Sequence, residues 1–170
     1  MELLFFYLSA FIAVLSTVMV ITRLNAVHAL LFLIVSLLAV AMLFYLLGAP
    51  FAALLEVIVY AGAIMVLFVF VIMMLNLGHT TVDREKSWLQ PSMWVAPGIL
   101  SAILFIELVW VMGSDASMSG ATVVGAKEVG ILLFGPYLLA VEIASMLLLA
   151  GLVGAYHLGR PDTKKRVQDR

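Results

Sequence analysis

The chain has 170 residues, of which 65% are hydrophobic and 11% are charged, with a mean hydropathy of +1.22 and a formal net charge of −1. Soluble domains are typically about 45–50% apolar and about 25% charged, so this composition excludes a soluble protein and is typical of a polytopic membrane protein. The absence of cysteine excludes a thiolate-bound iron–sulfur cluster or zinc site in this chain. The three histidines are far apart in the sequence, so we expect no metal site.

Five apolar segments are long enough to cross a membrane, since a helical span needs about 20 residues. They cover residues 2–22, 27–47, 51–77, 93–112 and 132–157. The first begins with an acid rather than with positive charge, so we interpret it as a retained span and not as a cleavable signal peptide. The expected fold is an all-α polytopic membrane protein, with a single membrane domain over residues 1–158 and a short basic tail over residues 159–170.

Lysine and arginine are divided unequally between the two sides of this layout. The first connection, the third connection and the tail share one side, which holds Arg23, Arg84, Lys86, Arg160, Lys164, Lys165, Arg166 and Arg170. The other side holds only Lys127. Because cytoplasmic loops carry the excess of basic residues, the N-terminus is predicted to face outward and the C-terminus the cytoplasm.

Glu56 is an acid inside the third segment, about one and a half helical turns from its start. An ionised carboxylate in hydrocarbon costs several kcal/mol, so an acid in a membrane span is a functional hypothesis by default. Tyr60 follows four residues later on the same helix face, where its hydroxyl could donate to the carboxylate or help to hold a water. The alternative is that Glu56 extends to the lipid headgroups and that Tyr60 is an ordinary interfacial aromatic. We favour the functional interpretation.

Small residues follow at once, as Ala61-Gly62-Ala63. Their commoner use in membranes is close helix packing. The sharper interpretation is a π-bulge, a local insertion in the helix register that is often found at functional sites. Glycine lowers helix stability by about 1 kcal/mol relative to alanine, so Gly62 is a suitable point for such a change.

Two further acids lie within spans. Glu142 is near the middle of the fifth segment, with Ser145 three residues on and able to hydrogen-bond it. The alternative for Glu142 is a protonated structural acid that a neighbouring helix satisfies. Glu107 is close to Trp110 and Gly113 at the outward end of the fourth segment. We interpret Glu107 as an interfacial acid beside an aromatic belt residue.

Three blocks of the chain resemble subunit J of the bacterial proton-pumping NADH:quinone oxidoreductase (respiratory complex I), the counterpart of mitochondrial chain 6. They are NAVHALL at residues 25–31, EVIVYAGAIMVLFVFVIMMLNL at 56–77 and FGPYLLAVEIASMLLLAGL at 134–152. One departure is Ala26, which stands where this family often has proline. Glu107 does not belong to the family pattern, so the resemblance gives it no role.

The resemblance implies a membrane-arm subunit that holds no redox centre and couples quinone reduction to proton pumping. Its third helix is expected to carry a π-bulge in some states, in the region matching residues 60–69. Rotation of that helix would open or close a water-mediated proton path, for which Glu56, Tyr60 and Glu142 are the candidate residues here. The candidates for the change of register and the gate are Gly62, Ala63, Met65, Val66, Phe68 and Val69.

The same resemblance implies the surroundings of the chain. FMN and iron–sulfur clusters would lie in partner subunits, quinone would bind nearby, and the complex would act as a translocase in the cell inner membrane. The expected partners are the quinone-site and antiporter-like subunits and the lipid, with no nucleic acid. The alternative is an ion-transport subunit of a related cation/proton antiporter or membrane hydrogenase complex. A purely structural membrane scaffold is a further alternative.

Overall fold

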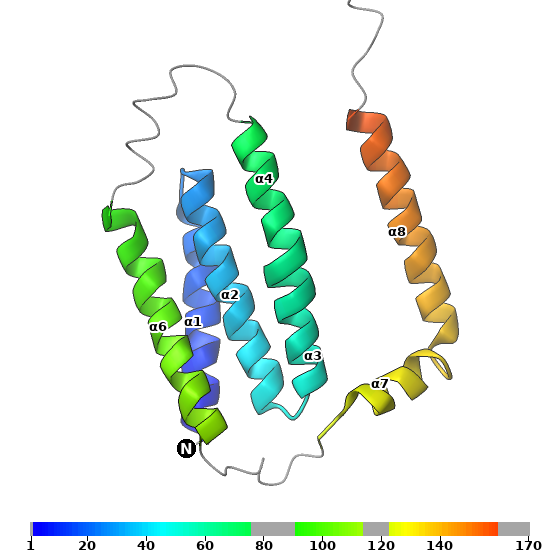
Figure 1. The fold of residues 1–170 in the computed structure, drawn as a ribbon, viewed down its shortest axis with the longest axis horizontal. Helices are drawn as coiled ribbons and strands as arrows, with labels where there is room; N and C mark the ends of the chain where they lie inside the picture. Colours follow the sequence, from blue (N-terminus) through cyan, green and yellow to red (C-terminus); the bar gives the residue numbers. More distant parts are fainter. Residues whose placement is uncertain (1, 76–90, 114–122, 160–170) are drawn as a thin grey trace, which may run out of the picture. The chain divides into compact units, whose positions relative to one another are not determined.

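The computed structural model describes residues 2–75, 91–113 and 123–159, and every regular element within them is a helix (Figure 1). Five helices in these ranges are long and apolar enough to cross a membrane. The prediction of an all-α membrane protein with five long apolar helices is therefore confirmed. The chain divides into two compact units, Met1–Gly125 and Ala126–Arg170.

The first unit begins with α1 (Glu2–Thr22) and α2 (Ala26–Leu46). Asn25 starts α2, because its side-chain oxygen accepts hydrogen bonds from the amides of Val27 at 3.0 Å and His28 at 3.3 Å. These amides would otherwise lack partners at the first turn of the helix. The observed bounds of both helices agree with the predicted spans to within one residue.

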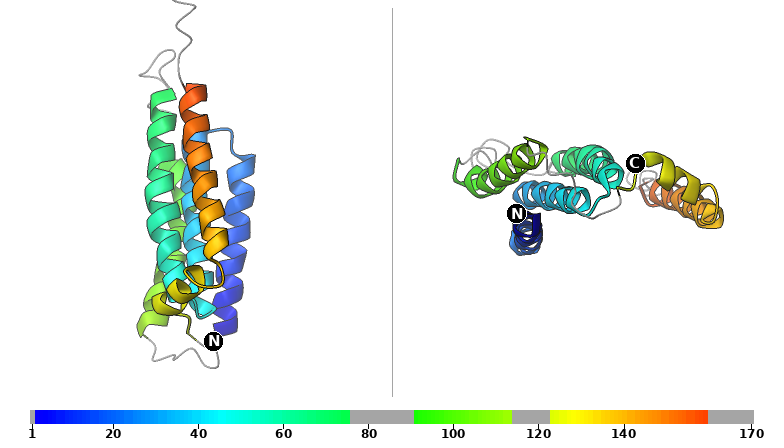
Figure 2. Two further views of the ribbon diagram at one scale, coloured as in Figure 1. Left: turned by 90° about the vertical axis from the view of Figure 1, so that its right-hand side faces the viewer. Right: turned by 90° about the horizontal axis from the view of Figure 1, so that it is seen from below.

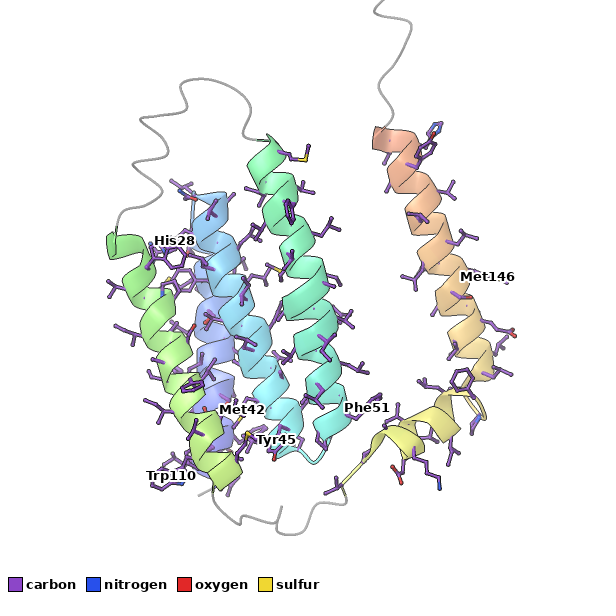
Figure 3. The ribbon with its side chains drawn as sticks, viewed as in Figure 1. His28, Met42, Tyr45, Phe51, Trp110 and Met146 are labelled. Carbon is purple, nitrogen blue, oxygen red and sulfur yellow. The ribbon has the colours of Figure 1, made fainter. Side chains whose placement is uncertain are left out.

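A tight turn joins α2 to the third long helix. Gly48 has φ of 86°, in the left-handed region that glycine adopts without steric cost. Pro50 then occupies the first turn of the next helix, where its missing N–H costs nothing. Figure 3 shows Tyr45 and Phe51 near this turn.

The third long helix consists of three consecutive segments: α3 (Pro50–Leu55), η1 (Glu56–Ile64) and α4 (Met65–Leu75). The last two residues of the predicted span, 76 and 77, lie outside the described residues. The fourth long helix, α6 (Pro91–Gly113), includes Pro97 within its length. The predicted fourth span, 93–112, lies inside these bounds.

Helix α2 is the centre of the first unit. It packs against α1, against α6 and against the third long helix, as the end-on view in Figure 2 shows. The core lies where α1, α2 and α6 meet and is formed by Ile12, Ala13, Val35, Ala39 and Leu104. Most other large apolar side chains of the unit are exposed in the chain taken alone. They are available to lipid or to neighbouring helices.

The second unit holds α7 (Ala126–Leu133) and α8 (Leu138–Gly159), joined by a turn. The predicted fifth span, 132–157, is wrong at its start, because residues 132 and 133 still belong to α7. The amide of Tyr137 bonds the Leu132 carbonyl at 3.0 Å, and Leu138 bonds the Gly135 carbonyl at 3.2 Å. A Cβ at Gly135 would lie only 2.7 Å from the Ile131 carbonyl oxygen, so this turn requires glycine. The basic tail lies outside the described residues.

Candidate functional site

The third long helix contains a π-helical segment, Glu56–Ile64, between two α-helical segments. The amide of Met65 bonds the carbonyls of Tyr60 and Gly62. A bond to the carbonyl five residues earlier is the mark of the π register. The backbone remains in the right-handed helical region at Leu55 (φ −63°, ψ −39°) and at Met65 (φ −67°, ψ −37°). The helix therefore changes register twice without a break.

This π segment lies earlier than expected. The resemblance indicated residues 60–69, whereas the observed segment begins at Glu56 and ends at Ile64. The observed and the expected ranges share residues 60–64, and Gly62 therefore lies within both. Val66, Phe68 and Val69 are outside it, in α4.

Gly62 makes close contact with its own helix. A Cβ at this position would lie 3.1 Å from the carbonyl oxygen of Val57, five residues earlier. Such a contact between a Cβ and a carbonyl oxygen is tight, and the carbonyl would have to move by a few tenths of an ångström to accommodate it. A side chain at residue 62 would have to displace that carbonyl, which itself belongs to the π segment.

Glu56 and Tyr60 both lie in the π segment, one turn apart. Glu56 is partly buried, whereas Tyr60 is 51% exposed. Within the described part of the chain, no hydrogen bond joins the two side chains. The expected contact is therefore absent from this conformation. Tyr60 instead faces the surface that a lipid or a neighbouring helix would cover.

The gate candidates differ in their exposure. Met65, the first residue after the π segment, is 2% exposed and belongs to the buried core. Four others are exposed in the chain taken alone: Ala63, Val66, Phe68 and Val69. Only Met65 among them therefore fills space inside this unit.

Glu142 is exposed on α8, in the second unit. The hydroxyl of Ser145 donates to the backbone carbonyl of Glu142 at 2.7 Å, not to its carboxylate. Ser145 therefore does hydrogen-bond Glu142, at the backbone carbonyl and not at the carboxylate. A serine in a helix commonly bonds a carbonyl of the preceding turn, and that local bond is made here.

The surroundings of Glu107 differ most from those predicted from the sequence. Its side chain is 2% exposed, and its Oε1 accepts a hydrogen bond from the hydroxyl of Ser9 in α1 at 2.7 Å. The interpretation as an interfacial acid did not foresee this burial between helices of the chain. Trp110 does behave as expected, since it is exposed near the end of α6 (Figure 3). The serines at positions 9 and 16, spaced like one helix face, were the available signal for a polar buried face.

No group of three or more metal-binding side chains gathers in the residues that the structure describes. Two separate features of the first unit are instead candidates for a functional role. One is a helix with an alternative hydrogen-bond register and an acid at its first π-helical residue. The other is a buried carboxyl group between α1 and α6.

The chain is similar to known proteins over nearly its whole length. The family described as NADH-ubiquinone/plastoquinone oxidoreductase chain 6 matches residues 16–158. NADH-quinone oxidoreductase subunit J of Pseudomonas aeruginosa is 61% identical over 162 residues, covering 94% of this chain and 98% of that protein. The subunit J of Escherichia coli is 58% identical over 158 residues, covering 92% and 86% respectively. That of Buchnera aphidicola from Schizaphis graminum is 50% identical over 156 residues, covering 91% and 96%.

The match to the family covers well over half of the chain, and the relatives are similar from near one end to near the other. The five long apolar helices agree with a multi-pass membrane subunit. The chain belongs to the family of subunit J of NADH-quinone oxidoreductase, respiratory complex I.

Proposed function

We propose that this chain couples quinone reduction to proton translocation through a gated water path at its third long helix. It acts as a translocase subunit in the membrane arm and holds no catalytic redox site. FMN and iron–sulfur clusters belong to partner subunits, and quinone binds nearby. The supporting observation is the π-helical segment Glu56–Ile64, which begins with an acid and lies within a long apolar helix.

The proposed gate is a rotation of the helix beyond the π segment. Removing the extra residue of the π register turns the following helix by about 100°, the angle of one residue in an α-helix with 3.6 residues per turn. Met65 would leave its buried position, and an exposed neighbour such as Val66 would turn toward the unit. A change of this kind opens or closes a passage between bulky apolar side chains.

The proposed path uses water and carboxyl groups. Glu56 supplies an exchangeable proton at the start of the π segment, and the Tyr60 hydroxyl can hold a water beside it in the rotated state. Glu142 supports conduction from α8 without being the sole relay. The remaining acids of the path come from neighbouring membrane-arm subunits.

The register change is tested by replacing Gly62 with a bulky residue. Gly62→Leu crowds the Val57 carbonyl and should impair both proton pumping and NADH:quinone reductase activity while the complex still assembles. Gly98→Leu is the matched control, because it lies in another long apolar helix and a Cβ there meets nothing within 4 Å. Normal coupled turnover of the Gly62→Leu complex would refute the gating proposal.

The proposed location is the cell inner membrane, with the N-terminus outward and the C-terminal tail in the cytoplasm. The unequal distribution of lysine and arginine supports this orientation. A reporter fused after Arg170 should read as cytoplasmic, and one fused at the N-terminus should read as external. The opposite pair of signals would reverse the orientation without affecting membership of the family.

A further inference from the structure

The side chains of Ser9 and Glu107 meet inside the first unit, between α1 and α6. The Ser9 hydroxyl donates to Glu107 Oε1 at 2.7 Å, and the two residues are 0% and 2% exposed. Leu104, one turn before Glu107, packs in the core with Ile12 and Ala13. The carboxyl group is therefore covered by helices of this chain itself.

The helices around Glu107 carry no cation to pair with it. No lysine or arginine occurs within Glu2–Thr22, Ala26–Leu46 or Pro91–Gly113. The other titratable side chains on these helices are Glu2, Tyr7, His28 and Tyr45. Arg23, just after α1, is about 21 Å from Ser9 along the helix axis, at 1.5 Å per residue. An ionised Glu107 would therefore have no lysine or arginine to pair with on the three described helices α1, α2 and α6.

The second carboxyl oxygen favours the neutral acid, because a buried neutral O–H without a partner costs less than a buried charge without one. Glu107 Oε2 is buried and has no hydrogen-bond partner in the described part of the chain. In an ionised carboxylate, this oxygen would carry negative charge without a donor, inside a membrane-spanning helix, which is strongly unfavourable. In the neutral acid, Oε1 is the carbonyl oxygen that accepts from Ser9, and Oε2 carries the proton.

We propose that Ser9 and Glu107 form a buried proton-binding site between α1 and α6, with Glu107 held as the neutral carboxylic acid. The site is independent of the π segment, since none of its residues belongs to the third long helix. It adds a protonatable group to the chain besides Glu56 and Glu142.

Other hydroxyl groups extend the polar character of this region along α1. Ser16, about two turns beyond Ser9 on the same face, is fully buried, and its Oγ has no partner among the described residues. Next to it, Thr17 and Ser36 share a hydrogen bond of 2.8 Å, and Ser36 also donates to the Ala13 carbonyl at 3.1 Å. A neutral acid suits such a region of uncharged hydrogen-bonding groups, because no group there stabilises a full negative charge.

Infrared spectroscopy of the full chain in lipid bilayers at neutral pH tests the proposal. The difference between the wild type and Glu107→Gln should show the loss of one carbonyl band of a neutral carboxylic acid. Ser9→Ala should shift that band to higher frequency, because the carbonyl loses its hydrogen bond. Glu128→Gln is the matched control: this acid is exposed on α7, and its replacement should leave the band assigned to Glu107 unchanged.

Two results would overturn the proposal. One is the loss of carboxylate bands, instead of a carboxylic acid band, in Glu107→Gln. The other is a Ser9→Ala spectrum in which the carboxylic acid band does not move. The Ser9→Ala measurement also decides the question alone if Glu107→Gln fails to insert, because it leaves the acid in place.

Discussion

The amide of Met65 donates a hydrogen bond to the carbonyl oxygen of Tyr60, five residues earlier in the same helix. This bond closes the π segment at the point where α4 begins. Met65 is buried, whereas Val66, the next residue, is 53% exposed. The register of the third long helix therefore determines which of these two neighbouring side chains faces the inside of the unit.

Replacing Met65 with alanine should destabilise the first unit. Truncating a buried methionine to alanine typically costs about 2–5 kcal/mol, and we expect the lower end here because lipid offers an apolar alternative to packing. Unfolding of the full chain in detergent micelles measures the difference. Val66→Ala is the control and should change the free energy of unfolding little. Equal losses in the two variants would show that Met65 is not a core residue.

Glu56 and Glu142 are tested together as proton-path residues. The double variant Glu56→Gln/Glu142→Gln keeps the shape of both side chains and removes both ionisable groups. We expect assembly to remain normal and proton pumping by the complex in inverted membrane vesicles to fall severalfold, with quinone reduction falling alongside it. Full pumping activity in the double variant would reduce both residues to structural acids.

The Asn25 cap at the start of α2 leads to a prediction about the stability of the first turn of this helix. The Asn25 side chain accepts from the amides of Val27 and His28, and removing such a cap typically costs about 1 kcal/mol. Asn25→Ala should therefore speed hydrogen exchange at these amides, about fivefold if the whole cost appears in local opening. Asn25→Asp, which keeps the accepting oxygen, should preserve their protection. Unchanged exchange in the alanine variant would contradict the observed cap.

The sequence was sufficient to predict the long helices, because span length and apolar composition are both set by the bilayer thickness. The break before α8 was missed because Leu132, Leu133 and Phe134 are as apolar as the span that follows, although Gly135-Pro136 is a sequence signal for a turn. Hydropathy detects the environment of a segment and not its backbone geometry. The short distance between Gly135 and the Ile131 carbonyl becomes visible only in three dimensions.

The candidate site was predicted in part for a similar reason. A π-helical piece does include Gly62, a glycine among small residues and so a weak point in the helix, but it begins earlier than the resemblance implied. The inward orientation of Glu107 was missed. In a helix that is apolar on all sides, no periodic pattern separates the face toward the bundle from the face toward lipid. The serines of α1 at positions 9 and 16 were the available signal, and the packing of Glu107 against Ser9 identifies the inward face.

The turn between α7 and α8 gives the last prediction. Gly135→Ala would place a Cβ 2.7 Å from the Ile131 carbonyl oxygen, a distance that forces the backbone to move. We expect a lower yield of folded chain and a lower level of assembled complex in membranes. Gly130→Ala is the control, because Gly130 lies in α7 and a Cβ there meets nothing within 4 Å. Alanine also favours a helix over glycine by about 1 kcal/mol, so this variant should assemble at least as well as the wild type. If Gly135→Ala assembles as well as Gly130→Ala, the chain does not need the observed turn, and α8 can begin earlier than Leu138.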